Sequence, residues 1–382
     1  MTREVVIGID FGTSCTSAGA LIDGHVELVQ EAGDAVIPSV VYVPDRGPPE
    51  IGRTAAMRQL SDPARVIRSV KRALGAGAGS AELRRYAATA PFRIDTSGDH
   101  VLFKLRSGDC PPEQVAAWVL GRVRELAERK YGGTVRKAII TVSAAPSPSY
   151  RDAILRAARI AHLDVLDFVA EPIAGGLALG IHAEPGERRL LVCDFGGGTF
   201  DVSAIVQSGL RFSPIATCAD AYLGGDDLDT ALAEGVAGQI FKQRGYDMHR
   251  DITRWNELVY RCEQAKRQLS TAETARVAMR EAYTHKGVTH DLDVTVDRAW
   301  AYERWRPLME RAVAVVRETL ARASWTYDQV DAAVLIGGTS LVPRVQVSPH
   351  ADVAVALGAA LLTARYNGAP GAGVPVLTRL AS

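Results

Sequence analysis

Two glycine-rich turns, each following a run of apolar residues, hold the residues of this chain whose types and spacing could do chemistry. The first turn is residues 10–14, with the sequence DFGTS, and the second is residues 194–199, with the sequence DFGGGT. Backbone N–H groups gather at such turns, and glycine lets a ligand approach them closely. The hydroxyl groups of Thr13, Ser14 and Thr199 add further donors. These turns therefore favour the binding of a phosphate-like anion.

Each turn begins with an aspartate, and the two aspartates suggest a cation beside the anion. Asp10 and Asp194 would supply carboxylates for Mg²⁺, which usually keeps several waters and takes one or two carboxylates plus phosphate oxygens. A third turn, Gly-Gly-Thr-Ser, occupies residues 337–340. One such turn alone is equally well explained as an ordinary hairpin, but the set favours a polyphosphate gripped from two sides. The Walker pattern GxxxxGK[ST] is absent, which excludes a P-loop enzyme.

The elements that must position these turns read as a duplicated unit. Residues 5–9 are apolar and β-branched and predict a buried strand, and residues 16–21 and 25–30 continue it as a β-meander. Residues 190–193 and 200–206 repeat the strand, the glycine-rich turn and the following strand. Such an internal duplication predicts two similar lobes that face each other.

The rest of the chain reads as two insertions joined by helices and strands. Residues 45–111 are rich in Gly, Pro and Arg and predict a smaller inserted subdomain, and residues 225–297 predict a second insertion that is mainly helical. Residues 368–373 read as a flexible tail. The other expected elements are helices at 113–130, 148–162 and 353–365 and strands at 137–142 and 330–336.

The composition is that of a globular protein without a dominant charge. The chain has 382 residues, which suggests two or three domains, and its 44 basic residues balance 44 acidic ones. This balance argues against a basic face for nucleic acid. The five cysteines are scattered, without zinc spacing or a disulfide framework. Neither a signal peptide nor a bilayer-length apolar run is evident, so we expect a soluble, cytoplasmic protein without a membrane partner.

The glycine-rich turns and three further segments resemble those of the Hsp70 chaperones. Residues 8–13 look like the family's first phosphate loop, residues 194–203 are nearly identical to its second, and residues 334–343 match its third nucleotide loop. Residues 171–178 resemble the family's connecting segment, and residues 262–270 look like its adenosine-contacting helix.

The motifs run in the family's order from residue 5 to about residue 364. The resemblance implies an α/β chain with the actin-like ATPase fold, in which two duplicated RNase H-like lobes with mixed sheets enclose a nucleotide cleft. Lobe I would be residues 1–168 with an inserted subdomain at about 39–111, and lobe II would be residues 169–382 with an inserted subdomain at about 225–297. The family's substrate-binding domain and acidic linker are not evident, so ordinary chaperone cycling is not expected from this chain alone.

The resemblance also implies roles for individual residues. Asp10 and Asp194 would hold Mg²⁺ through waters, Lys71 would lie near the γ-phosphate, and Glu171 and Asp201 would orient or activate the attacking water. The implied catalytic set is Lys71, Glu171, Asp201 and Thr199. The implied nucleotide contacts are Gly12, Thr13, Ser14, Gly196, Gly197, Gly198, Thr199, Gly224, Gly225, Glu263, Lys266, Arg267, Ser270, Gly337, Gly338, Thr339, Leu341 and Asp352.

Helical spacing supports the adenosine-contacting segment on its own terms. Residues 263, 266, 267 and 270 lie at i, i+3, i+4 and i+7, which places their side chains on one face of a helix. Such a face could bind ribose hydroxyls and stack a guanidinium on adenine. Without the other motifs, an exposed ion-pair helix would be the favoured interpretation.

Three departures from the family pattern bear on function. Leu341 stands where the family carries an adenine-stacking arginine, so we expect weaker or less selective base binding. Only residues 344–351 separate Pro343 from Asp352, where the family has a further helix; this is either a natural deletion or an edited sequence. Ser143 replaces a proline implicated in interdomain signalling, which puts that relay in doubt.

Three functions remain open at this point. The first is an Hsp70-like ATPase that binds MgATP between two lobes, hydrolyses it slowly to ADP and phosphate, and regulates a partner or client protein by lobe closure. The second is a non-hydrolysing nucleotide sensor or an actin-like filament protein. The third is a small-molecule kinase on the same fold, although no acceptor motif is evident.

Overall fold

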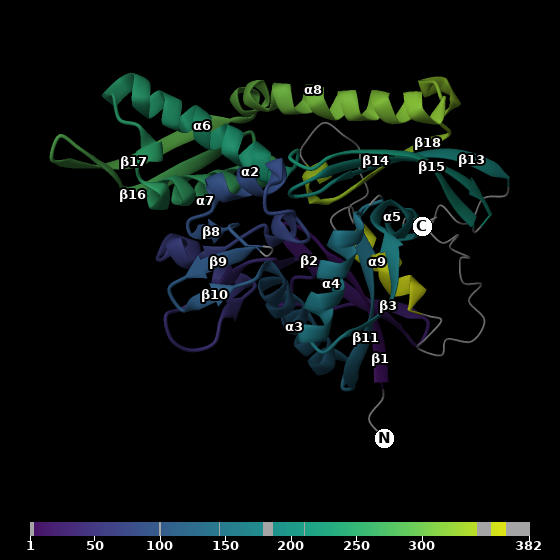
Figure 1. Ribbon diagram of the computed structural model, residues 1–382. Helices are drawn as coiled ribbons and strands as arrows, with labels where there is room; N and C mark the ends of the chain where they lie inside the picture. Colours follow the sequence, from purple (N-terminus) through teal and green to yellow (C-terminus); the bar gives the residue numbers. More distant parts are fainter. Residues whose placement is uncertain are drawn as a thin grey trace.

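The computed structural model describes residues 4–98, 101–144, 146–178, 186–209, 211–341 and 353–363, and it shows two lobes stacked on each other (Figure 1). The lower lobe is built on a mixed sheet, in which β4 (Ile37–Pro38) pairs with β2 (Cys15–Ile22) outside the main order of strands. The main path of this sheet is β12 (Asp164–Ala170), β11 (Thr134–Val142), β1 (Glu4–Phe11), β2 (Cys15–Ile22) and β3 (His25–Leu28).

The upper lobe repeats this plan. Its sheet has the order β15 (Arg211–Asp220), β14 (Phe200–Ser208), β13 (Glu187–Phe195) and β18 (Ala332–Ile336). In each lobe the first strand pairs antiparallel with the next strand and parallel with a strand from much later in the lobe: β1 with β2 and β11, and β13 with β14 and β18. The duplication predicted from the two turns is confirmed.

Two apolar helices, α5 (Glu171–Ala178) and α9 (Ala354–Leu362), form the layer between the sheets (Figure 1). One core cluster runs through this layer, because it combines Ile139 of β11, Leu177 of α5 and Val192 of β13. Glycine allows the closest approach: a Cβ on Gly8 of β1 would lie 2.4 Å from the carbonyl carbon of Ala359 in α9. The two lobes therefore share a packed base.

The lower lobe carries the helices expected beside its sheet. α3 (Pro112–Tyr131) ends at Gly132, which adopts φ 63°, and α4 (Pro148–Ile160) begins after Ser147, whose hydroxyl caps the N–H of Tyr150. The small elements of the inserted part are β5 (Val41–Tyr42), β6 (Glu50–Ile51), β7 (Val66–Ile67), β8 (Arg93–Asp95), β9 (Leu102–Leu105), β10 (Gly108–Cys110), α1 (Arg53–Met57), α2 (Ala81–Thr89) and the 3-10 helices η1 (Arg58–Leu60), η2 (Pro63–Arg65) and η3 (Val70–Ala73).

The second insertion differs from the prediction in one respect. It contains α6 (Gly225–Arg244), η5 (Met248–Arg250) and α7 (Ile252–Leu269), but residues 274–297 form a hairpin of β16 (Thr274–His285) and β17 (Val288–Asp297). The prediction of a mainly helical insertion missed this hairpin. In β16 the apolar residues alternate, with Ala275, Val277 and Met279 buried against the helices, and this is the period of a strand.

The long helix α8 (Arg298–Ala323) joins this insertion to the upper sheet along the top of the molecule (Figure 1). The remaining described elements are η6 (Tyr327–Gln329) and η7 (Gly338–Leu341). All five cysteines are free thiols. None of the helices in the described ranges combines the length and apolarity needed to cross a bilayer. The lobe boundaries at residues 168 and 169 stay a prediction, and the tail at 368–373 lies outside the described residues.

Candidate functional site

A cavity of about 370 Å³ lies between the two lobes, and its walls come from both. The turns after β1 and β13, the turn after β18 and one face of α7 all reach it. The structure thus brings together most of the residues that the sequence singled out. Those that line this cavity are Asp10, Gly12, Thr13, Ser14, Lys71, Glu171, Asp194, Gly196, Gly197, Thr199, Gly225, Glu263, Lys266, Arg267, Ser270, Gly337, Gly338, Thr339 and Leu341.

Three of the predicted site residues that the structure describes do not line this cavity, and a fourth falls outside the described ranges. Asp201 lines a neighbouring cavity of about 450 Å³, together with Lys71. Gly198 directs its carbonyl oxygen to the guanidinium of Arg72, at 2.9 Å. Gly224 packs on the second turn, since a Cβ there would lie 2.5 Å from the carbonyl oxygen of Gly197. Asp352 lies outside the described residues.

The first two glycine-rich turns touch each other across the cleft. A Cβ on Gly197 would lie 2.0 Å from the Ser14 hydroxyl oxygen, and a Cβ on Gly198 would lie 2.4 Å from the methyl carbon of Thr13. Any residue larger than glycine at position 197 or 198 would therefore force the two lobes apart. The third turn joins the second through the Thr339 hydroxyl, which donates to the carbonyl oxygen of Gly196 at 2.8 Å.

Carboxylates from both lobes converge at the inner end of this cleft. Asp194 and Asp201 are Cα partners across the β13–β14 hairpin, and Glu171 begins α5; all three are buried. Burial, followed by repulsion from Glu171, raises the pKa of Asp10 to about 7 and the pKa of Asp201 to about 7. The same two causes raise the pKa of Asp194 well above its usual value. The Thr141 hydroxyl donates to Asp10 at 3.1 Å.

One ammonium group sits among these carboxylates. The Nζ of Lys71 donates to Glu171 Oε1 at 2.9 Å, and both side chains are largely buried. Burial opposes the charge of Lys71, but attraction from Glu171, followed by Tyr150 and Asp10, outweighs it and raises the lysine's pKa well above its usual value. A single lysine leaves the carboxylate cluster with excess negative charge.

Oxygen donors with excess negative charge suit a hard divalent cation. Mg²⁺ commonly takes one or two carboxylates, several waters and phosphate oxygens, and Asp10 and Asp194 fit that donor set. Within the described ranges, no three His, Cys, Asp or Glu side chains are placed to hold an ion by themselves. With Mg²⁺ bound, the phosphates of a nucleotide could approach a cluster that would otherwise repel them.

The predicted face of α7 lies at the outer end of the cavity, but its charged side chains already bind other groups of the protein. Lys266 Nζ donates to the carbonyl oxygen of Gly225 at 2.8 Å and to Asp229 at 2.9 Å. Glu263 accepts from Arg267 at 2.8 Å and from Arg68 of the other lobe at 3.0 Å. The helix therefore also serves as an interlobe ion-pair surface. Leu341 lines the same cavity and is 37% exposed.

Several lining residues were not found from the sequence. They are Cys15, Asp34, Val36, Asp226, Asp229 and Val355. A usable signal existed for Asp226, because it follows Gly224-Gly225 in the first turn of a helix, where carboxylates are favoured. The N–H groups of Gly225 and Asp226 donate to the carbonyl oxygens of Gly196 and Gly197, at 3.1 and 2.7 Å.

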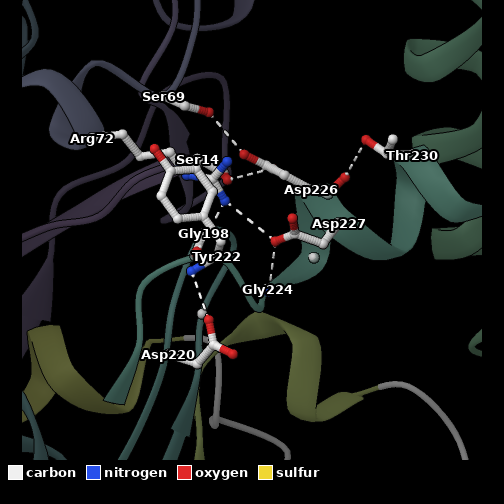
Figure 2. Close-up of polar contacts among 12 residues, drawn as sticks. Ser14, Ser69, Arg72, Gly198, Asp220, Tyr222, Gly224, Asp226, Asp227 and Thr230 are labelled. Atoms are coloured by element: carbon white, nitrogen blue, oxygen red, sulfur yellow. Dashed lines mark hydrogen bonds and ion pairs between the residues drawn. The ribbon is translucent and has the colours of Figure 1, made fainter. Parts of the chain in front are cut away.

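Asp226 bridges the lobes through two hydroxyl groups (Figure 2). Ser14 Oγ donates to one of its carboxylate oxygens at 2.8 Å, and Ser69 Oγ donates to the other at 2.7 Å. Burial disfavours the charge on Asp226, but Arg68, Arg72 and these hydroxyls together hold its pKa below the usual value. Ser69 has φ 52° and directly precedes η3, the 3-10 helix that carries Lys71.

A second interlobe contact, which we call the clasp, consists of Arg72, Arg85 and Tyr222. The guanidinium carbons of Arg72 and Arg85 lie 4.6 and 4.3 Å from the centre of the Tyr222 ring, and the Tyr222 hydroxyl donates to the carbonyl oxygen of Glu82. Figure 2 shows Arg72 beside this ring and joined to Asp227, at 3.3 Å. The segment that carries Lys71 is thus held from lobe II on both sides.

The fold and the cleft together define the class of protein. Two duplicated lobes with mixed sheets, each presenting a glycine-rich turn and an aspartate to a shared cleft, form the actin-like ATPase fold. Comparison with protein families gives the particular family: the model described as Hsp70 protein matches residues 6–371. The chain belongs to the Hsp70 family. Because the proteins of this family are ATPases, the enzyme class implied by the sequence is confirmed at the level of the family.

A curated relative gives the same answer. The chain is 35% identical over 348 residues to the Oryza sativa subsp. japonica protein named Heat shock 70 kDa protein BIP3. The match covers 89% of this chain and 51% of that protein, so the chain spans about half the length of the relative. The cytoplasmic location expected from the sequence stays a prediction.

The raised carboxyl pKa values predict that Mg²⁺ binding releases protons. In the folded protein without a cation, Asp10 and Asp201 have pKa values of about 7, above their values in the unfolded chain, so their ionisation destabilises the fold as the pH rises from about 4 to about 7. A bound cation favours the ionised forms. Titration calorimetry of MgADP in buffers of different ionisation enthalpy should therefore show proton release at pH 6.5 that disappears by about pH 8.5. Equal release at both pH values would contradict this account.

The clasp should hold the lobes closed. In Tyr222→Leu the ring and hydroxyl are lost while the apolar bulk stays, so two cation–π contacts of about 0.5–2 kcal/mol each disappear. We expect MgADP to dissociate about tenfold faster, as measured by stopped-flow release of a fluorescent analogue. Tyr327→Leu, at a tyrosine that is 59% exposed, serves as the matched control and should leave the rate unchanged. An unchanged rate in Tyr222→Leu would show that the clasp does not limit opening.

Proposed function

We propose that this chain binds MgATP between its two lobes and hydrolyses it slowly to ADP and phosphate, and that the resulting opening and closing of the lobes regulates a partner protein. The observation that carries the proposal is the buried pair of Lys71 and Glu171, 2.9 Å apart, at the point where carboxylates of both lobes converge. A site that only bound nucleotide would not need this buried pair.

The chain's own residues supply distinct parts of the reaction. The N–H groups of the three turns and the hydroxyls of Thr13 and Thr199 would hold the phosphates. When bound, Mg²⁺ would supply charge neutralisation and orientation of the phosphate oxygens. Glu171 and Asp201 would orient the attacking water, whose oxygen forms a bond to the terminal phosphorus as the bond to the ADP oxygen breaks. Phosphoryl transfer depends on such positioning more than on covalent participation.

Lobe closure would complete this arrangement. Lys71 sits on η3, where its neighbour Arg72 contacts Asp227 and Tyr222 of lobe II. Ser69, just before η3, donates to Asp226 of the same lobe. The lysine therefore reaches its working position only when the lobes meet. This makes the proposed turnover sensitive to anything that opens the cleft, including a bound protein. The nucleotide base is proposed to lie against α7 and Leu341.

The test is ATP binding and turnover by the purified chain and by Lys71→Ala. We expect Lys71→Ala to lower single-turnover hydrolysis at least about 100-fold, the scale for losing one preorganised donor to the transition state. Its affinity for ADP should change less than about threefold, since ADP lacks the terminal phosphate. Lys137→Ala, which removes a partly exposed lysine 3.3 Å from Glu4, is the control and should match the parent.

Other outcomes separate the remaining functions. Binding of MgATP without turnover would favour a nucleotide sensor, and pelleting with ATP at high protein concentration would favour a filament protein. Phosphate transfer to a sugar or another small hydroxyl compound would favour a kinase. Calorimetry that detects no binding at millimolar MgATP would exclude all of the nucleotide-dependent functions.

A further inference from the structure

The carboxylate end of the cleft adjoins a second cavity of about 450 Å³. Three of its lining residues, Thr13, Lys71 and Thr199, also line the first cavity, so the two cavities meet where the terminal phosphate is proposed to lie. Asp201 and Tyr150 line the second cavity but not the first. Tyr150 was not singled out from the sequence, and the roles proposed above do not use it.

The position of the Tyr150 ring is fixed by the lower lobe. Tyr150 lies in the first turn of α4, its backbone N–H is held by the Ser147 hydroxyl at 3.2 Å, and its side chain packs against the apolar core of that lobe. The ring therefore presents its hydroxyl from a rigid element.

The Tyr150 hydroxyl is buried beside the Lys71 ammonium group, which can only donate to it, and its own proton has no well-formed acceptor among the groups that the structure describes. A buried donor without an acceptor destabilises a protein, and native structures rarely keep one without a reason. The adjoining cavity and the proposed nucleotide supply such a reason, because a phosphate oxygen there could accept its proton.

The charged groups that face this hydroxyl keep it a donor. Lys71 is its charged neighbour, and Glu171 and Asp10 lie beyond. Burial, offset in part by Lys71, raises the pKa of Tyr150 to about 12, so the phenol keeps its proton at neutral pH. A protonated phenol next to an ammonium group presents two donors toward the same point.

We propose that the Tyr150 hydroxyl donates a hydrogen bond to an oxygen of the terminal phosphate as that phosphate is transferred to water, beside the contact made by Lys71. The proposal rests on the proposed ATPase function. The phenol keeps its proton throughout the reaction. A bond forms between the water oxygen and phosphorus while the bond from phosphorus to the ADP oxygen breaks. The proton lost by water is accepted by the carboxylates. Tyr150 would stabilise charge that grows on the phosphate oxygens in the transition state.

The test is Tyr150→Phe, which keeps the ring and removes only the oxygen. We expect single-turnover hydrolysis to fall about tenfold to 100-fold, the range for losing a hydrogen bond to a charged group. Affinity for ADP should stay within about twofold. Binding of ADP with aluminium fluoride, which mimics the phosphate in transfer, should weaken by the same factor as the rate.

Stability separates this role from a structural one. Because the proton of this hydroxyl has no well-formed acceptor before the nucleotide binds, Tyr150→Phe should leave the unfolding temperature of the nucleotide-free chain close to that of the parent. The control is Tyr131→Phe, which removes a hydroxyl that donates to the carbonyl oxygen of Glu27 at 2.7 Å in the same lobe. That variant should lower the unfolding temperature and leave hydrolysis unchanged.

Two results would overturn the proposal. Hydrolysis by Tyr150→Phe at the parent rate would show that the hydroxyl does not touch the reacting phosphate. A loss of hydrolysis accompanied by equal losses in ADP affinity and unfolding temperature would assign Tyr150 a structural role. If the parent chain itself binds MgATP but does not hydrolyse it, the proposed function fails first and this proposal fails with it.

Discussion

The structure depends on one electrostatic constraint, namely that carboxylates contributed by both lobes, three of them buried, gather around Lys71. Asp10 comes from one duplicated hairpin, Asp194 and Asp201 come from the other, and Glu171 begins the helix between them. Like charges brought together in a buried site repel one another unless protons or cations compensate them. Lys71 compensates one carboxylate, and the remaining negative charge makes the closed cleft a site for Mg²⁺ and its phosphate ligands.

The surrounding elements can be understood as the means of bringing those charges together and letting them separate again. The α5–α9 layer packs the two lobes at their base, where Gly8 allows a close approach. Farther from this base, two sets of contacts join the lobes. One is the pair of hydrogen bonds from Ser14 and Ser69 to Asp226, and the other is the clasp at Tyr222. An apolar base with polar contacts at the mouth is the arrangement expected of a hinge whose closed state is stabilised by a ligand.

Sequence patterns predicted the parts of this protein whose structure is determined by residues close together in the sequence. The glycine-rich turns, the strands before and after them and the capped start of α4 followed from residue type and spacing, and the resemblance added Lys71 and Glu171. The β16–β17 hairpin was missed, although Ala275, Val277 and Met279 alternate with the period of a strand.

The contacts that close the cleft could not be predicted in this way. Ser69 and Asp226 lie far apart in the sequence, and the Tyr222 ring meets arginines that belong to the other lobe. No local pattern encodes such pairs, because they exist only after both lobes have folded and met. The same holds for Tyr150, whose buried hydroxyl becomes notable only beside Lys71 and an adjoining cavity.

The most direct test of the central claim is the affinity of the chain for ATP with Mg²⁺ and with EDTA, measured by calorimetry at pH 7.5 and constant ionic strength. If the buried carboxylates make the cation essential, ATP should bind at least about 100-fold more tightly with Mg²⁺, a difference of about 2.7 kcal/mol. Equal affinities under the two conditions would contradict the account, because phosphates would then enter the carboxylate cluster without compensation.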